Sequence, residues 1–327
     1  MPGYSPEGDR AHPDHTMARD SEDDDMKKPK ALAGALTSDH AASWIFLLPA
    51  SLVLLVTAVA PLCYSLYISF FKYKLNTPHA VPEFIGFDNY AKIFSQRLFQ
   101  VSLSNTALFA VLSVAFEILL GVILAMMLNN DRKGTRIIIS VLLIPMIMAP
   151  VASGTLWRMM YDRSTGVLNY FLRLLGVEPI NFLGSSKFAI YSVIFVDIWR
   201  LTPWVTIIVA SALKGISGSL VEAAVVDGAT RFQIFLRIIL PLLRPVLMIV
   251  LMIRFTDAFK VFDTVYVMTG GGPGNSTEML PNYIYNQALK YMNVGYAASL
   301  AFVFITAMAL LSVLFIYLRN RAYESVR

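Results

Sequence analysis

Long apolar stretches constrain this chain more than any other feature of its sequence. Six stretches are long enough to cross about 30 Å of hydrocarbon as helices, and they are residues 44–71, 105–128, 137–157, 188–213, 246–268 and 295–318. Backbone polar groups inside a bilayer must be paired within the protein, which favours α-helices in all six. The sequence therefore predicts an all-α integral membrane protein with six transmembrane helices.

The composition supports this prediction and excludes an ordinary soluble enzyme. Of 327 residues, 56% are hydrophobic and 15% are charged, whereas a soluble domain is about 25% charged. The 27 Lys and Arg residues exceed the 22 Asp and Glu residues only slightly. This basic excess is interpreted as a signal of membrane topology and not of nucleic-acid binding.

Basic residues concentrate in alternate segments between the spans. The outer loops, 72–104, 158–187 and 269–294, are long and carry fewer basic residues than the short inner segments. The inner residues are Lys27, Lys28, Lys30, Arg132, Lys133, Arg136, Lys214, Arg231, Arg237, Arg244, Arg319, Arg321 and Arg327. The positive-inside rule therefore predicts that both termini are cytoplasmic. Residues 1–43 are too polar to form a core and are predicted to be a disordered tail, and residues 321–327 a short C-terminal tail.

The cytoplasmic segment 219–245 has a local pattern of its own. Ser219 with Glu222, and Thr230 with Gln233, each fit a helix capping box. Gly228 lies between them and can adopt the left-handed backbone that a sharp turn requires. Two short helices joined by an abrupt turn are predicted. Spacing alone also leaves open an amphipathic hairpin that lies on the lipid headgroups.

The second of these helices is predicted to be amphipathic. Phe232, Phe235 and Ile239 recur at helical spacing and would form one apolar face. Pro241 and Pro245 follow, and they are expected to end the helix before the fifth span.

This segment resembles the EAA loop of ABC importer permeases. The resemblance is carried by the run Glu222-Ala223-Ala224-Val225-Val226-Asp227-Gly228-Ala229, followed by Phe235, Leu240, Pro241 and Pro245. In that family the loop is a coupling helix that docks into a cleft of a cytoplasmic ATPase. The resemblance implies an ATPase-coupling role for Glu222, Ala223, Ala224, Asp227, Gly228, Ala229, Phe235 and Pro241. Glu222 has two interpretations, as half of a capping box or as a contact to the ATPase.

The resemblance extends over residues 44–320, the expected permease domain. The chain resembles carbohydrate-type importer permeases at Asn105-Thr106, in 145–157, at Asp197-Ile198-Trp199 with Pro203, and in 268–273. The arrangement of spans and loops along the chain is similar to that of the maltose-transporter first permease type. This resemblance implies a type I bundle in a bacterial inner membrane. It also implies a second permease subunit in a heterodimer, two ATPase subunits, an extracytoplasmic solute-binding protein and a sugar as cargo.

Motifs for catalysis and for metal binding are absent from the sequence. Gly270-Gly271-Gly272-Pro273 is glycine-rich but lacks the lysine of a phosphate loop. We interpret this run as a turn or a gate. ATP and Mg²⁺ are accordingly expected on partner ATPase subunits, with no cofactor on this chain. The chain is predicted to be a non-catalytic transport subunit.

Ionisable residues inside the predicted spans are candidates for the substrate path, because charges in a bilayer are costly. Arg254, Asp257, Lys260 and Asp263 stand three residues apart in the fifth span, and Asp197 and Arg200 repeat the spacing in the fourth. Near the outer mouth, the candidates are Tyr266, Asn282, Tyr283 and Asn286. Mutual neutralisation of the charges is the alternative to a polar sugar route. Glu117 stands alone in the second span, and a hydrogen bond to another helix is expected for it.

Three other classes of membrane protein are alternatives to the importer permease. An ion-coupled transporter or channel is the main alternative, but such carriers often contain internal repeats, and the pattern of 219–245 has no second copy. An integral membrane enzyme would need a catalytic constellation that the sequence lacks. A pure scaffold would not need charges in the middle of its spans.

Overall fold

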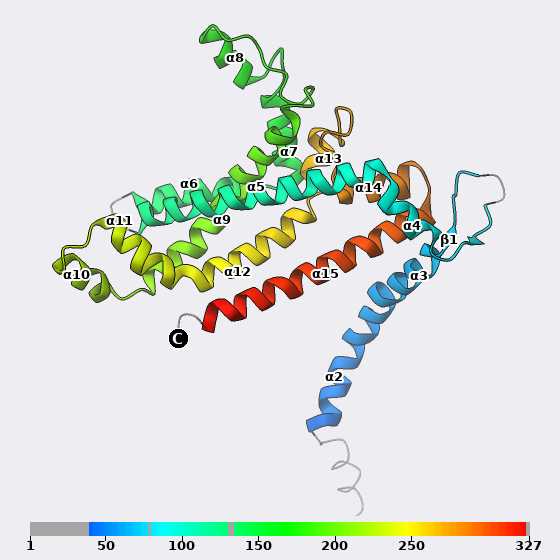
Figure 1. Cartoon of the computed structure of the whole chain (residues 1–327), viewed down its shortest axis with the longest axis horizontal. Helices are drawn as coiled ribbons and strands as arrows, with labels where there is room; N and C mark the ends of the chain where they lie inside the picture. The colour runs from blue at the N-terminus through cyan, green and yellow to red at the C-terminus, as the bar shows by residue number, and fades with distance from the viewer. Residues whose placement is uncertain (1–38, 78–79, 130–133, 325–327) are drawn as a thin grey trace, which may run out of the picture. The chain divides into compact units, whose positions relative to one another are not determined.

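The computed structural model describes residues 39–77, 80–129 and 134–324 (Figure 1). The chain divides into two compact units, residues 1–63 and 64–327. The described part of the first unit is one helical rod, formed by α2 (Asp39–Leu54), a π-helical turn (Leu55–Val59) and the start of α3 (Ala60–Ser69). Most of the predicted disordered tail, residues 1–38, lies outside the described residues, and so do residues 325–327. Residues 39–43 belong to α2.

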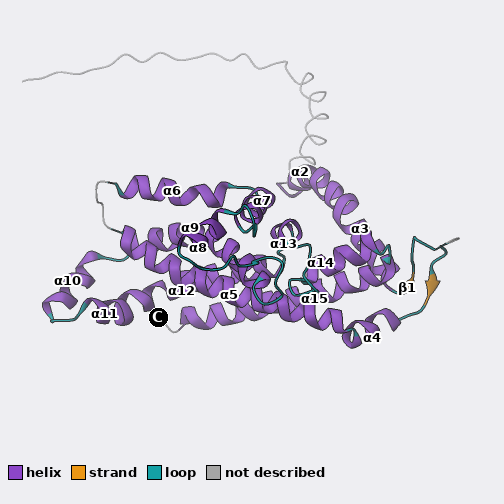
Figure 2. Cartoon of the chain, turned by 90° about the horizontal axis from the view of Figure 1, so that it is seen from above, coloured by secondary structure: helices purple, strands orange, loops and turns teal. Residues whose placement is uncertain are grey.

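Four long helices run side by side in the second unit (Figures 1 and 2). They are α5 (Arg97–Leu128), α9 (Ala189–Lys214), α12 (Leu240–Phe259) and α15 (Val294–Glu324). Helix α5 packs along α9, and α12 contacts α5, α9 and α15. Gly121 permits the close approach of α5 to α9, since a Cβ atom there would lie 2.6 Å from Cγ1 of Val205. The core therefore lies between α5, α9 and α12.

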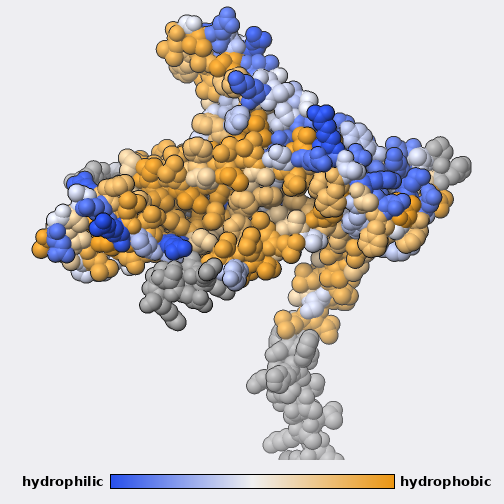
Figure 3. All heavy atoms as spheres, in the orientation of Figure 1, coloured by the Kyte–Doolittle hydropathy of each residue, from blue (hydrophilic) through white to orange (hydrophobic). Residues whose placement is uncertain are grey.

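Short elements occupy the two ends of this bundle. One end carries α10 (Gly218–Val226) and α11 (Arg231–Ile234), and the other carries α4 (Asp88–Ser95), α14 (Leu280–Tyr285) and the π-helical turn Asn286–Lys290 (Figure 2). At the α4 end, β1 (Phe71–Lys72) pairs antiparallel with β2 (Glu83–Phe84), with Phe71 opposite Phe84. Apolar residues cover the helices between the two ends, and hydrophilic residues gather at both ends (Figure 3). This pattern is that of a bundle embedded in a membrane.

Five helices in the described residues are long and apolar enough to span a membrane, or six if one bent pair is a single span. The bent pair is α6 (Thr135–Ile147) and α7 (Pro150–Met160), whose axes differ by 96°. Met148 and Ala149 between them have extended ψ angles of 135° and 141°. A proline disfavours helical geometry in the residue before it, so Pro150 begins a new helix in a new direction. The third predicted span, 137–157, is thus not one straight helix.

The fifth predicted span also differs in its bounds. Helix α11, the π-helical turn Phe235–Ile239 and α12 form one continuous helical segment, Arg231–Phe259. The expectation that Pro241 and Pro245 end a helix before this span is therefore wrong. Pro241 lies in the first turn of α12, directly after the π-helical turn, where the wider backbone spacing tolerates a missing N–H donor. The segment instead breaks at residues 260–262, before α13 (Asp263–Met268).

Candidate functional site

Three long helices each contribute one charged residue to a buried ion-pair network. Arg254 on α12 donates from Nε to Oε2 of Glu117 on α5, at 2.7 Å, and from Nη2 to Oε1, at 3.0 Å. The same Nη2 donates to Oδ2 of Asp197 on α9, at 3.2 Å. Glu117, Asp197 and Arg254 are 0%, 2% and 4% exposed. The network therefore ties α5, α9 and α12 together at one level of the bundle.

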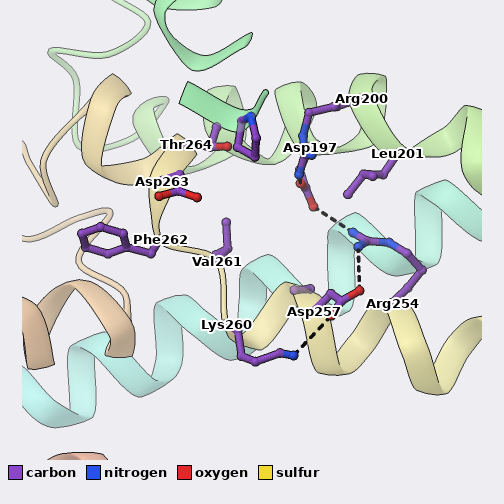
Figure 4. Close-up of a pocket in the computed structure, with 12 residues that line it drawn as sticks. Asp197, Arg200, Leu201, Arg254, Asp257, Lys260, Val261, Phe262, Asp263 and Thr264 are labelled. Carbon is purple, nitrogen blue, oxygen red and sulfur yellow. Dashed lines mark hydrogen bonds and ion pairs between the residues drawn. The ribbon is translucent and has the colours of Figure 1, made fainter. Parts of the chain in front are cut away.

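The network continues from these buried residues into more exposed ones. Asp197 also accepts from Nη2 of Arg200 at 3.2 Å. On the other side of Arg254, Oδ2 of Asp257 lies 4.0 Å from Nη1, and Oδ1 of Asp257 lies 3.3 Å from Nζ of Lys260. Figure 4 shows that carboxylates and cations alternate along this path. The i,i+3 pairs expected from the sequence at 197/200, 254/257 and 257/260 are confirmed, whereas the pair expected at 260/263 does not form, because the helix breaks at residues 260–262.

A cavity of about 250 Å³ opens beside the exposed half of the network, next to the break that follows α12. We call it the inner cavity. Its charged lining residues are Asp197, Arg200, Arg254, Asp257, Lys260 and Asp263. The hydroxyl of Thr264 and Nε of Arg200 belong to lining residues and have no hydrogen-bond partner among the described residues. The cavity wall thus combines ion pairs with two buried polar atoms that lack partners.

All six charged candidates for the substrate path line the inner cavity, but the four candidates near the outer mouth lie elsewhere. Asn282 and Tyr283 are buried, and they hydrogen-bond to Glu278 and Tyr296. Tyr266 and Asn286 line a separate outer cavity of about 540 Å³.

Some contacts around the inner cavity were predictable from the sequence and others were not. The expected hydrogen bond of Glu117 to another helix is confirmed, but its partner lies 137 residues away and local spacing gave no signal of it. Thr264 was missed as a lining residue because a lone threonine beside a charged row carries no distinctive signal. Trp199 packs edge-to-face on Trp157, with ring centroids 5.3 Å apart.

A sharp turn joins α10 to α11 at the other end of the bundle. Gly228 has φ = +80°, as its position in the sequence predicted, and its N–H donates to the carbonyl of Val225 at 3.0 Å. Thr230 and Gln233 form the expected capping box of α11. The capping box expected at Ser219 and Glu222 is wrong, because α10 already begins at Gly218 and Ser219 lies inside its first turn.

The surface of this loop is partly apolar and open. Val225, Val226 and Phe232 are 59%, 87% and 69% exposed, while Ala224 is buried. Glu222, Ala223, Asp227, Gly228 and Pro241 are also exposed, and Ala229 and Phe235 are half-buried. Phe235 and Ile239 pack against the core cluster between α5, α9 and α12. The loop is therefore anchored in the bundle on one side and offers apolar side chains on the other.

Sequence comparison places these features in a known context. Residues 117–324 match the model of the family described as "Binding-protein-dependent transport system inner membrane component". The trehalose/maltose transport system permease protein MalF of Thermococcus litoralis is 36% identical over 277 residues, which are 84% of this chain and 92% of that protein. The sulfoquinovosyl glycerol transport system permease protein SmoG of Agrobacterium fabrum is 32% identical, covering 89% of this chain and 93% of the relative.

The fold is shared with a solved structure. The crystal structure of a bacterial alginate ABC transporter, in complex with a periplasmic protein that binds an alginate pentasaccharide, contains a chain that superposes with a TM-score of 0.77. The two chains are 23% identical, and the match covers 89% of this chain and 97% of the other. The two chains therefore share a fold. The chain belongs to the family of binding-protein-dependent transport system inner membrane components.

Proposed function

We propose that this chain is the permease subunit of an ABC importer that moves a sugar, a polyol or a related sugar derivative into the cell. The proposal is supported by the relatives that are named as sugar or sugar-derivative permeases. The chain itself has no catalytic role in this proposal. ATP and Mg²⁺ are held by separate ATPase subunits, and this chain contributes the transport path.

The observation that carries the proposal is the continuity of one helical segment. Arg231–Phe259 runs from the exposed loop at one end of the bundle to the inner cavity. Phe235 and Ile239 seat its first turns in the core, and Arg254 and Asp257 lie near its far end. A helix moves as a stiff element, so displacement of α10 and α11 by an ATPase would shift the charged residues of the cavity.

The coupling residues have distinct roles in this mechanism. Gly228 sets the angle between α10 and α11, and the exposed Val225, Val226 and Phe232 supply apolar contact area for the ATPase. Ala223 is small and exposed, so that a partner surface can approach the helix closely. Glu222 and Asp227 are exposed charges at the same surface.

The inner cavity provides half of a transport route in this proposal. Its side chains carry hydrogen-bonding groups, and a sugar could exchange its hydration for them. A second permease subunit would supply the other half, in a heterodimer with two ATPase subunits. An extracytoplasmic solute-binding protein would deliver the sugar to the outer end. Both termini of this chain would be cytoplasmic.

Uptake by cells tests the proposal. A strain that lacks this gene is complemented with the wild-type gene or with an empty vector, and the uptake of ¹⁴C-labelled trehalose, maltose and sorbitol is measured. We expect gene-dependent uptake that arsenate abolishes, since arsenate depletes ATP. Uptake that survives ATP depletion but stops with an uncoupler would instead identify an ion-coupled transporter.

A further inference from the structure

The cations that line the inner cavity all belong to one network of ion pairs. The carboxylates of Asp197 and Asp257 alternate with the cations of Arg200, Arg254 and Lys260 (Figure 4). Glu117, which does not line the cavity, also pairs with Arg254. Each cation of this network lies within 4.0 Å of a carboxylate oxygen. The network therefore contains no spare cation.

One further carboxylate stands outside this network. Asp263 lines the same cavity and forms no ion pair with any described residue. An acidic group entering the cavity would find every cation of the network already engaged and would face this additional negative charge. Like charges placed together across an interface cost up to several kcal/mol, so such a group would be rejected.

The charge of the cargo is not fixed by the family or by the fold. The relative from Thermococcus litoralis is named for trehalose and maltose, which are uncharged sugars. The solved transporter of the same fold imports alginate, an acidic polysaccharide. The residues that line the path in each chain must therefore decide between uncharged and acidic cargo.

We infer that the inner cavity selects uncharged carbohydrates and rejects their acidic derivatives, with Asp257 setting this selectivity by neutralising Lys260. The inference rests on the proposed function and adds the charge class of the cargo. An uncharged sugar can donate hydrogen bonds from its hydroxyls to the exposed carboxylates of Asp257 and Asp263. None of these contacts requires a charge on the sugar.

Asp257 is the most suitable position for a test. Its side chain is 52% exposed, so its replacement does not bury an unpaired group. In Asp257→Asn, Lys260 loses its only carboxylate partner among the described residues and becomes a free cation at the cavity wall. Asp263→Asn is the matched control, because it removes one negative charge from the same cavity without freeing a cation.

Binding is measured on the complex purified through a tag on this chain, in nanodiscs and without a solute-binding protein, by saturation-transfer difference NMR. The probes are matched pairs, maltose with maltobionate and sorbitol with gluconate. We expect the wild type to bind the neutral member at least about 100-fold more tightly than the acid. In Asp257→Asn the affinity for the acid should rise about tenfold or more, and in Asp263→Asn by a clearly smaller factor, because that variant removes a repulsive charge without freeing a cation.

The double variant Asp257→Asn with Lys260→Gln separates the free cation from general loosening of the site. It should lose the acid binding that Asp257→Asn gains. Equal binding of acid and neutral sugar by the wild type would overturn the inference, as would an Asp257→Asn complex that still rejects acids. Cellular uptake of the neutral probes reports separately on the proposed function: normal uptake without charge discrimination overturns the inference alone, and no uptake of any probe counts against the proposed function itself.

Discussion

The guanidinium group of Arg254 donates to both carboxylate oxygens of Glu117, at 2.7 and 3.0 Å, across 137 residues of sequence. Both side chains are almost fully buried, and Asp197 accepts a further hydrogen bond from the same arginine. A buried charge is tolerated in a membrane only when it is paired. The three long helices that supply these residues are therefore held in register by one arginine.

Removal of Glu117 should destabilise the protein. Glu117→Leu leaves Arg254 buried with less compensation, and breaking a buried pair costs about 3–5 kcal/mol. We expect a lower thermal unfolding midpoint of the purified protein and a lower yield from membranes. Lys260→Gln is the control, because it breaks an exposed pair that is worth less than about 1 kcal/mol. An equal loss of stability in both variants would show that the buried network does not hold the helices.

Substitution of Gly228 should uncouple transport without removing the protein from the membrane. A β-branched residue at φ = +80° is strained by about 1–3 kcal/mol, although a Cβ atom there would meet no other atom within 4 Å. In Gly228→Val we expect normal membrane abundance, loss of the co-purified ATPase and no uptake. Gly218→Ala is the matched control, since Gly218 has no positive φ and an added Cβ also meets open space. Normal ATPase stimulation in Gly228→Val would remove the main support for this loop as the coupling element.

Local patterns predicted local structure well in this chain. The lengths of the apolar stretches predicted where the long helices lie. The position of Gly228 between two predicted short helices indicated the residue with the left-handed backbone. The i,i+3 charge spacing predicted pairs on α9 and on α12, because neighbouring turns of one helix bring such side chains together.

Features that depend on other helices could not be predicted in the same way. The partner of Glu117 is chosen by the packing of α5 against α12, which the sequence of α5 does not encode. Prolines in membrane helices are often tolerated, so the sequence did not distinguish Pro145, which lies inside α6, from Pro150, which begins α7 at a 96° bend. Pro241 was misinterpreted for the same reason, since a π-helical turn absorbs its missing donor.

Acidification should stabilise the outer segment that contains Glu278. Burial raises the pKa of this carboxyl group above its ordinary 4.5, although hydrogen bonds from Asn286 and Asn282 and the charge of Lys290 oppose the shift. The folded protein then binds the proton of Glu278 more tightly than the unfolded chain does. The contribution of this group to the free energy of unfolding is therefore greatest below pH 4.5 and falls as the pH rises through the folded pKa. Thermal unfolding of the wild type and of Glu278→Gln at pH 5 and pH 8 measures this. We expect a smaller pH dependence in the variant, which cannot titrate, and identical dependence would contradict the assignment.

Crowding at Gly121 should separate α5 from α9. A Cβ atom added there would lie 2.6 Å from Cγ1 and 2.8 Å from Cβ of Val205, closer than packed carbon atoms approach each other. Overpacking of a close contact costs about 1–3 kcal/mol, so Gly121→Ala should lower the thermal unfolding midpoint.

The compensating change at Val205 tests whether this single contact is responsible. Val205→Ala removes Cγ1, the atom nearest to the new Cβ, but keeps Cβ of residue 205, and by itself it leaves a small gap in the buried core. In the double variant Gly121→Ala with Val205→Ala, the loss of stability should be smaller than the sum of the two single losses, because residues in contact are coupled. Losses that simply add would show that Gly121 is needed for a reason other than its approach to Cγ1 of Val205.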